Sequence, residues 1–139
     1  MYQKVIIAGN LGGDPEMRYM PDGTAVTNFS VATNRRWTDG SGEQKEETVW
    51  FRVSVWRKQA EAANEYLSKG RQVLVEGRLR PDAATGGPRT FTRQDGTVGA
   101  SYDLTADVVR YIGGRDSGGF SPEGGGQSAA PQEEDEIPF

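Results

Sequence analysis

One segment of eight residues constrains the fold of this chain more than any other part of the sequence. It runs from Val49 to Trp56 and reads VWFRVSVW. Side chains of a β-strand point alternately to the two faces of its sheet, so every second residue shares a face. One face of this segment is apolar throughout: Val49, Phe51, Val53 and Val55. We therefore expect a strand whose apolar face packs on a hydrophobic core.

The opposite face of the same segment carries Trp50, Arg52, Ser54 and Trp56. At about 3.3 Å per residue the two indole rings lie about 20 Å apart, too far to stack on each other. Packing under a loop or in a subunit interface is the ordinary explanation for a tryptophan. The alternation with Arg52 favours instead two separate platforms beneath one extended strand of nucleic acid.

Four further segments are rich in β-branched or aromatic residues, and turn-forming residues separate them. Together with the first, the predicted strands are Lys4–Asn10, Ala25–Asn34, Thr48–Trp56, Gln72–Arg80 and Ser101–Tyr111. The predicted turns are Gly12–Pro15, Pro21–Gly23, Asp39–Gly42 and Asp95–Gly96. Residues Gln59–Gly70 are helix formers that end in a glycine suited to a C-terminal cap, which predicts a helix. Three strands, one helix and two strands is the element order of an OB-fold, so we expect an all-β domain with one helix and a five-stranded barrel.

The composition of the chain changes after Ile112. Residues 113–139 read GGRDSGGFSPEGGGQSAAPQEEDEIPF and are rich in Gly, Ser, Pro and Gln. Such a segment cannot bury enough apolar surface to offset the entropy of ordering it, which predicts disorder. We therefore expect two parts, a barrel domain over residues 1–112 and a disordered acidic tail over residues 113–139.

The chain contains no cysteine and no histidine. Disulfides, thiolate zinc sites and cysteine nucleophiles are thereby excluded, as are the commonest general base and metal ligand. The carboxylates show no paired spacing typical of metal binding, and the sequence has no phosphate loop of the Walker type. We expect no enzymatic activity, no cofactor and no metal. The short apolar run before Asn10 is neither a signal peptide nor a membrane span, which favours the cytoplasm.

The net charge of −4 is unevenly distributed along the chain. Residues 1–112 hold 15 Lys and Arg against 14 Asp and Glu, whereas residues 113–139 hold one Arg against six acidic residues. The acidity belongs to the tail, so the barrel domain has room for a basic face. Cations interleaved with aromatic rings are what sequence-tolerant binding of a single strand requires, because cations track phosphates and a ring can stack on any base.

A co-linear series of motifs runs through residues 1–112. The motifs are Gly9–Gly23 (GNLGGDPEMRYMPDG), Asn28–Thr33 (NFSVAT), Thr48–Val53 (TVWFRV), Ala60–Gly70 and Val75–Arg80 (VEGRLR). Together they resemble those of bacterial single-stranded DNA-binding proteins. The resemblance implies an OB-fold that binds and protects single-stranded DNA during replication, recombination and repair. It also implies a homotetramer that is associated with the nucleoid and uses no cofactor.

The resemblance further implies which side chains stack on bases: Trp37, Trp50, Trp56 and Phe91, the last standing where the family often has Trp. Cations on the same strands and loops complete the predicted DNA-binding set: Arg35, Arg36, Arg52, Lys58, Arg78 and Arg80. Taken singly, Lys58 within this set, and Arg18, Arg57 and Arg89 outside it, are each more typical of solvated surface than of a contact.

The carboxyl end resembles the acidic Ile-Pro-Phe tip of the same family: Asp135, Glu136, Ile137, Pro138 and Phe139. A terminal Phe ring beside its own α-carboxylate suits a pocket with an apolar floor and a basic rim. Acidic tails often only aid solubility, but an apolar terminus favours recognition. We expect this tip to recruit replication and repair proteins and to compete with DNA for the basic groove.

Other classes of function stay open at this point. The chain could be an interaction adaptor whose barrel mainly oligomerises and displays tails, or an OB-fold enzyme or RNA chaperone, with catalysis ranked last. RNA binding is also open, because stacking platforms tolerate ribose. Oligo-thymidine should quench the Trp emission of a DNA-binding protein strongly and leave that of an adaptor unchanged.

Overall fold

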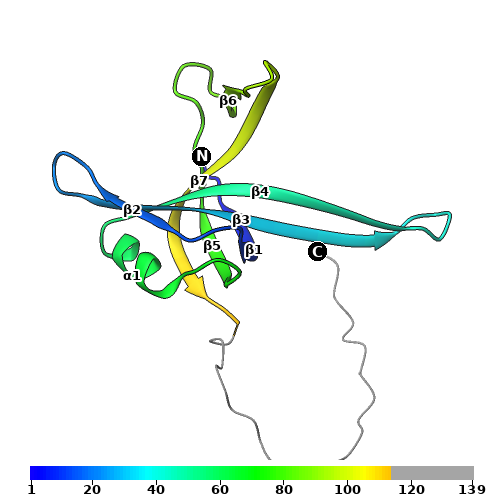
Figure 1. The fold of residues 1–139 in the computed structure, drawn as a ribbon, viewed down its shortest axis with the longest axis horizontal. Coiled ribbons are helices and arrows are strands. Elements are labelled where there is room, and N and C mark those ends of the chain that lie inside the picture. The colour runs from blue at the N-terminus through cyan, green and yellow to red at the C-terminus, as the bar shows by residue number, and fades with distance from the viewer. Residues whose placement is uncertain (114–139) are drawn as a thin grey trace, which may run out of the picture.

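The computed structural model describes residues 1–113, which form seven strands and one helix (Figure 1). The strands are β1 (Val5–Leu11), β2 (Glu16–Tyr19), β3 (Ala25–Thr38), β4 (Gln44–Trp56), β5 (Gln72–Leu79), β6 (Arg89–Thr92) and β7 (Val98–Tyr111). Helix α1 spans Lys58–Tyr66, between β4 and β5. No helix of this range combines the length and the apolar character that crossing a membrane requires. The predictions made for residues 114–139, including the tail and its tip, lie outside the described residues.

Five of the strands close into a barrel. Neighbouring strands pair in the order β1-β5-β7-β4-β3, and β3 pairs with β1 to complete the circle. β4 and β7 run parallel, and the other pairs of the barrel are antiparallel. β1 and β3 approach so closely that a Cβ atom on Gly9 would lie 2.1 Å from the carbonyl oxygen of Ala32. The predicted fold class, an all-β OB-fold barrel with one helix, is confirmed.

The interior of the barrel is filled by side chains from all five strands. They are Ile7, Leu11, Phe29, Val31, Val53, Val55, Val73, Val75 and Leu104. Helix α1 covers one end of the barrel, where Ala63 and the following Leu67 join the same apolar cluster (Figure 1). Thr27 fixes the helix to β3, because its hydroxyl donates to the carbonyl oxygen of Ala60 at 2.6 Å.

The hairpins are longer and more numerous than the sequence predicts. β3 and β4 continue past their predicted ends as one long hairpin that projects from the barrel (Figure 1). β2 pairs with the start of β3, and β6 pairs with the start of β7. These two strands have four residues each, which is too short for a periodic pattern to identify them.

Helix α1 ends earlier than predicted. The backbone is already extended at Leu67, whose N–H donates to the carbonyl oxygen of Ala63 at 3.0 Å. Gly70 forms a separate turn with a φ of 85°, and its N–H donates to the carbonyl oxygen of Leu11 at 2.9 Å. The prediction that Gly70 caps the helix is wrong, since this glycine instead connects the chain after the helix to β1.

The predicted apolar face of β4 is confirmed inside the barrel and becomes incomplete toward the hairpin. Val53 and Val55 are fully buried. Phe51 is only partly buried against the core, and Val49 is half-buried. The burial decreases because the hairpin leaves the barrel at this end of the strand.

The predicted outward face of β4 is also confirmed. Trp50 is 53% exposed and Trp56 is half-buried, and neither belongs to the apolar cluster of the core. Ser54 lies between them but is buried. Its hydroxyl donates to Oδ1 of the neighbouring Asn28 at 2.7 Å, which satisfies the buried polar group.

Candidate nucleic-acid interface

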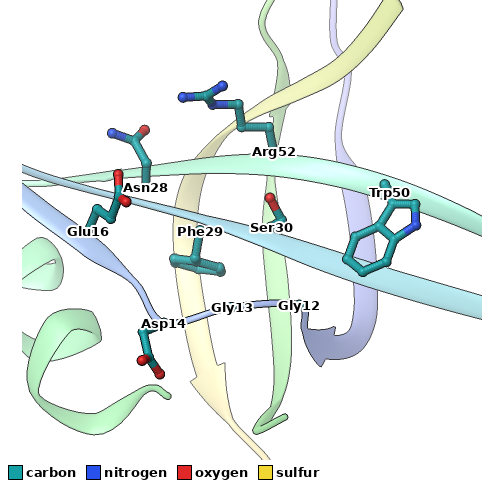
Figure 2. Close-up of a pocket in the computed structure, with 9 residues that line it drawn as sticks. All are labelled: Gly12, Gly13, Asp14, Glu16, Asn28, Phe29, Ser30, Trp50 and Arg52. Atoms are coloured by element: carbon teal, nitrogen blue, oxygen red, sulfur yellow. The ribbon is translucent and has the colours of Figure 1, made fainter. Parts of the chain in front are cut away.

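A groove runs over the outward face of β4 and the neighbouring part of β3 (Figure 2). The register of the two strands places Ser30 beside Arg52 and Ala32 beside Trp50. The loop after β1, residues 12–14, lines the groove from the other side, and the N–H of Gly12 donates to the carbonyl oxygen of Ser30 at 3.0 Å. The hollow has a volume of about 420 Å³ and is lined by one indole ring, one guanidinium group and two carboxylates, those of Asp14 and Glu16.

The indole ring of Trp50 lies directly against the backbone of Gly12. A Cβ atom on Gly12 would lie 2.4 Å from a carbon of the six-membered ring, so a larger residue would displace the indole. The tryptophan is nevertheless 53% exposed. The loop therefore supports one part of the ring while the rest is open, as a platform for base stacking requires.

A second hollow, of about 190 Å³, shares Asn28 and Arg52 with the groove. It is lined by four arginines: Arg18, Arg52, Arg80 and Arg89. The one carboxylate that lines it belongs to Asp103, whose Oδ2 lies 3.0 Å from Nε of Arg89. That ion pair neutralises Asp103, so the remaining arginines make this hollow positive, which suits a phosphate group.

Trp56 lies in a different hollow, of about 710 Å³, together with Arg57 and Arg78. Nε of Arg78 lies 3.8 Å from a carboxylate oxygen of Asp107 across the sheet. The two outward indoles of β4 therefore line separate hollows.

Trp37, Arg35 and Arg36 lie on the projecting part of the β3–β4 hairpin. The guanidinium carbon of Arg35 is 4.7 Å from the centre of the Trp37 ring, which is a cation–π contact. The two arginines also face glutamates across the hairpin, Arg35 at 3.6 Å from Glu47 and Arg36 at 3.6 Å from Glu46. These predicted binding cations are therefore ion-paired.

The turn of this hairpin is organised by Asp39. Its Oδ1 accepts hydrogen bonds from the hydroxyl and N–H of Ser41 and from the N–H of Glu43, at 2.7, 2.9 and 3.0 Å. The Ser41 hydroxyl bond is the main reason why the pKa of Asp39 is lowered from its ordinary value. The lowered pKa means that the Asp39 carboxylate keeps its charge to a lower pH than an ordinary aspartate.

The last two predicted residues lie apart from the groove. Phe91, on β6, is 42% exposed, and the guanidinium carbon of Arg93 sits 5.4 Å from its ring centre. Lys58, the first residue of α1, is exposed beside a shallow hollow that Asp22 also lines.

The predicted residues fall into five places: the groove with its adjoining hollow, the next hollow, two separate hairpins, and the start of α1. Trp50, Arg52 and Arg80 share the groove and its adjoining hollow, and Trp56 and Arg78 share the next hollow. The hairpins that carry Trp37 and Phe91 extend from the barrel in different directions (Figure 1). Within residues 1–113 no three acidic side chains are grouped closely enough to hold a metal ion.

Residues 2–112 match the family model described as the single-strand binding protein family. The chain belongs to this family. Two similar proteins, both named single-stranded DNA-binding protein, come from Neisseria meningitidis, one from serogroup A / serotype 4A and one from serogroup B. Each is 44% identical to this chain over 124 residues, which are 88% of this chain and 67% of the relative. The single-strand binding protein family consists of DNA-binding proteins and not of enzymes.

The sequence predicts as solvated surface two cations that the structure places in the second hollow. Arg18 lies on β2 and Arg89 on β6, and both line the hollow that also contains Arg52 and Arg80. A hairpin signal could have placed Arg18, because a predicted turn at Pro21–Gly23 folds its segment back on β3. For Arg89 the sequence offers no comparable signal.

Proposed function

We propose that this chain binds single-stranded DNA along the outward face of its barrel, without preference for base sequence. Single-stranded DNA binding is the function that the family and the names of the relatives support. The observation that carries the assignment to this face is the pairing of a supported, half-exposed Trp50 with Arg52 in one groove.

The chemistry of the groove fits an unpaired strand. A base has a flat face that can stack on the indole of Trp50, and each such stack contributes about 1–3 kcal/mol. Arg52 and Arg80 line the adjoining hollow and offer two cations to phosphates of the same strand. Neither arginine makes an ion pair with another residue of the described range.

The remaining predicted residues extend this surface. Trp56 and Arg78 offer a second stacking position with its own cation. Trp37 with Arg35 and Arg36, Phe91, and Lys58 are assigned as outer contacts for longer strands. Because these residues lie on projecting hairpins and on α1, they engage only when the DNA extends beyond the barrel.

A titration with oligo-thymidine of graded length tests the proposal. We expect strong quenching of Trp emission and a dependence of affinity on salt with a slope of about −0.7 per neutralised phosphate. A duplex of the same length is the control and should quench little, because its bases are already stacked. Unchanged emission and no complex at low salt would contradict the proposal.

We further propose that the protein acts in DNA replication, recombination and repair, and therefore in the cytoplasm with the nucleoid. The tip, residues Asp135, Glu136, Ile137, Pro138 and Phe139, recruits replication and repair proteins and competes with DNA for the groove. Deleting residues 132–139 should raise the affinity for DNA and abolish partner binding. A deletion that leaves both unchanged rules out this role for the tip.

A homotetramer is the assembly that we propose. β1 pairs with β5 along its length but with β3 only at Asn10 and Leu11, so one edge of Val5–Gly9 is unpaired within the described chain. Ile6 on this strand is 58% exposed. An unpaired edge with an exposed apolar side chain favours contact with a second copy.

Sedimentation equilibrium tests the assembly and should give four times the chain mass of 15.2 kDa. Ile6→Lys should reduce that mass, whereas Val98→Lys, at an even more exposed apolar residue on the β6–β7 hairpin, should not. A monomer at micromolar concentration, or equal masses for the two variants, would contradict the assembly or its location.

A further inference from the structure

Arg57 has a backbone conformation that side chains disfavour. Among residues 1–113 it is the sole residue other than glycine with a positive φ, at φ 63° and ψ −134°. This region is comfortable only for glycine, and another residue remains there only when its surroundings hold it. Here the N–H of Arg57 donates to the carbonyl oxygen of Ala25 at 2.8 Å, and its own carbonyl accepts from Ala60 at 3.0 Å.

No hydrogen bond to the helix cap and no ion pair of the Arg57 side chain within residues 1–113 compensates for this strain. The side chain makes no hydrogen bond to cap α1, which begins at the next residue. It forms no ion pair with any residue of the described range, and it is exposed. A glycine at this position would satisfy the backbone better, so the arginine needs another explanation.

The hollow that Arg57 lines explains why an arginine stands at this position. Trp56 lies next to it there, and Arg78 is the other cation. Two carboxylates line the hollow: Asp107 lies 3.8 Å from Arg78, and Asp22 accepts the N–H of Thr24 at 2.9 Å. The hydrogen bonds from Thr24 are the main reason why the pKa of Asp22 is lowered, and the positive charge of Arg57 contributes without an ion pair. Arg57 is therefore the cation of this hollow that makes no ion pair within residues 1–113, and it can bind an anion from outside the described chain.

We propose that Arg57 binds a phosphate of the DNA strand whose base stacks on Trp56. The strand then leaves the groove of Trp50 and Arg52, passes Trp56 and enters the hollow of about 710 Å³ in front of α1. This inference rests on the proposed binding of single-stranded DNA and adds a contact that the sequence had predicted as solvated surface. The strained backbone conformation is retained because it places the positive charge of Arg57 in the hollow beside Trp56.

Two variants of the full chain separate the backbone effect from the charge effect. Arg57→Gly relieves the strain and removes the charge, whereas Arg57→Gln removes the charge and keeps a side chain on the strained backbone. Both should weaken binding to oligo-thymidine about tenfold at low salt and reduce the salt slope by about 0.7. Only Arg57→Gly should raise the melting temperature, by about 4 °C or more.

Arg110→Gln is the matched control. Arg110 is exposed on β7, makes no ion pair within residues 1–113 and lines none of the hollows described above. Its replacement should leave affinity and salt slope unchanged.

Three results would overturn the inference. If Arg57→Gln binds like the wild-type protein with the same salt slope, Arg57 does not contact DNA, and the proposed function stands. If Arg57→Gly does not raise the melting temperature, the strain argument fails. If the charge effect disappears in a chain that lacks residues 132–139, Arg57 pairs with the acidic tip instead. A wild-type protein that does not bind oligo-thymidine would refute the proposed function itself.

Discussion

Two parts of the β3–β4 pair carry the same kinds of side chain in different electrostatic states. Within the barrel, Trp50 and Arg52 line a groove, and Arg52 makes no ion pair with the described residues. On the projecting hairpin, Trp37 is covered by Arg35, which also faces Glu47 at 3.6 Å. Two arginines of the same strand pair, each beside a tryptophan, can therefore differ in whether they are available to a ligand.

The difference matters for binding because a paired arginine must exchange one anion for another. Exposed ion pairs contribute little, typically less than about 1 kcal/mol, so the hairpin arginines can still be recruited. Their net gain on binding a phosphate is smaller than that of Arg52, which has no carboxylate to release. The barrel face should supply most of the affinity, and the hairpin should add to it on longer strands.

The largest expected effect is the difference in DNA affinity between replacing Trp50 and replacing Trp37. Trp50→Ala should weaken binding of a short oligo-thymidine by about 5- to 150-fold, the equivalent of one lost base stack. Trp37→Ala should cost only a few-fold on the same DNA, because its ring is already occupied by Arg35. Fluorescence anisotropy of labelled DNA measures both. Equal losses would show that the two regions contribute alike.

A smaller effect is expected for the arginines. Arg52→Gln should weaken binding about tenfold and lower the salt slope by about 0.7, since it removes one phosphate contact made by an arginine that has no ion pair to give up. Arg35→Gln should have less effect on both quantities, because Arg35 must give up its ion pair with Glu47 before it can bind a phosphate. A salt slope that falls equally in the two variants argues against the electrostatic difference between the regions.

Removing the hairpin glutamates should raise the affinity for DNA, whereas the substitutions above lower it. The double variant Glu46→Gln, Glu47→Gln releases Arg36 and Arg35 and should raise the affinity for long oligo-thymidine about two- to fourfold. The gain should vanish for strands too short to reach the hairpin. Glu65→Gln, at an exposed residue of α1 that makes no ion pair within the described range and lines none of the hollows, is the control and should leave the affinity near that of the wild type.

The smallest effect concerns the pH dependence of the hairpin turn. Because the folded-state pKa of Asp39 is lowered, its contribution to stability is present above the unfolded-state value and is lost as the pH falls through the folded-state value. The amide signal of Ser41 should titrate with a midpoint below 3.8. Asp39→Asn should abolish this titration, and a midpoint above 3.8 in the wild type would contradict the hydrogen-bond geometry.

The sequence could predict the barrel strands and the outward position of Trp50, because both follow from alternation within one strand. It could not predict that Arg35 and Glu47 pair, since this depends on the register of β3 against β4 and on where the turn closes. The hollow that joins Arg18 to Arg52 depends on a contact between separate elements. The positive φ of Arg57 has no signal in the sequence, because arginine itself gives no reason to expect it.

The most direct test of the barrel face uses two variants that each keep a single tryptophan. One retains Trp50, with Trp37→Phe and Trp56→Phe, and the other retains Trp37, with Trp50→Phe and Trp56→Phe. With a short oligo-thymidine at saturation, confirmed by anisotropy of the labelled DNA, the emission of Trp50 should be strongly quenched and that of Trp37 should change little. Unchanged Trp50 emission while the DNA is bound would contradict the account.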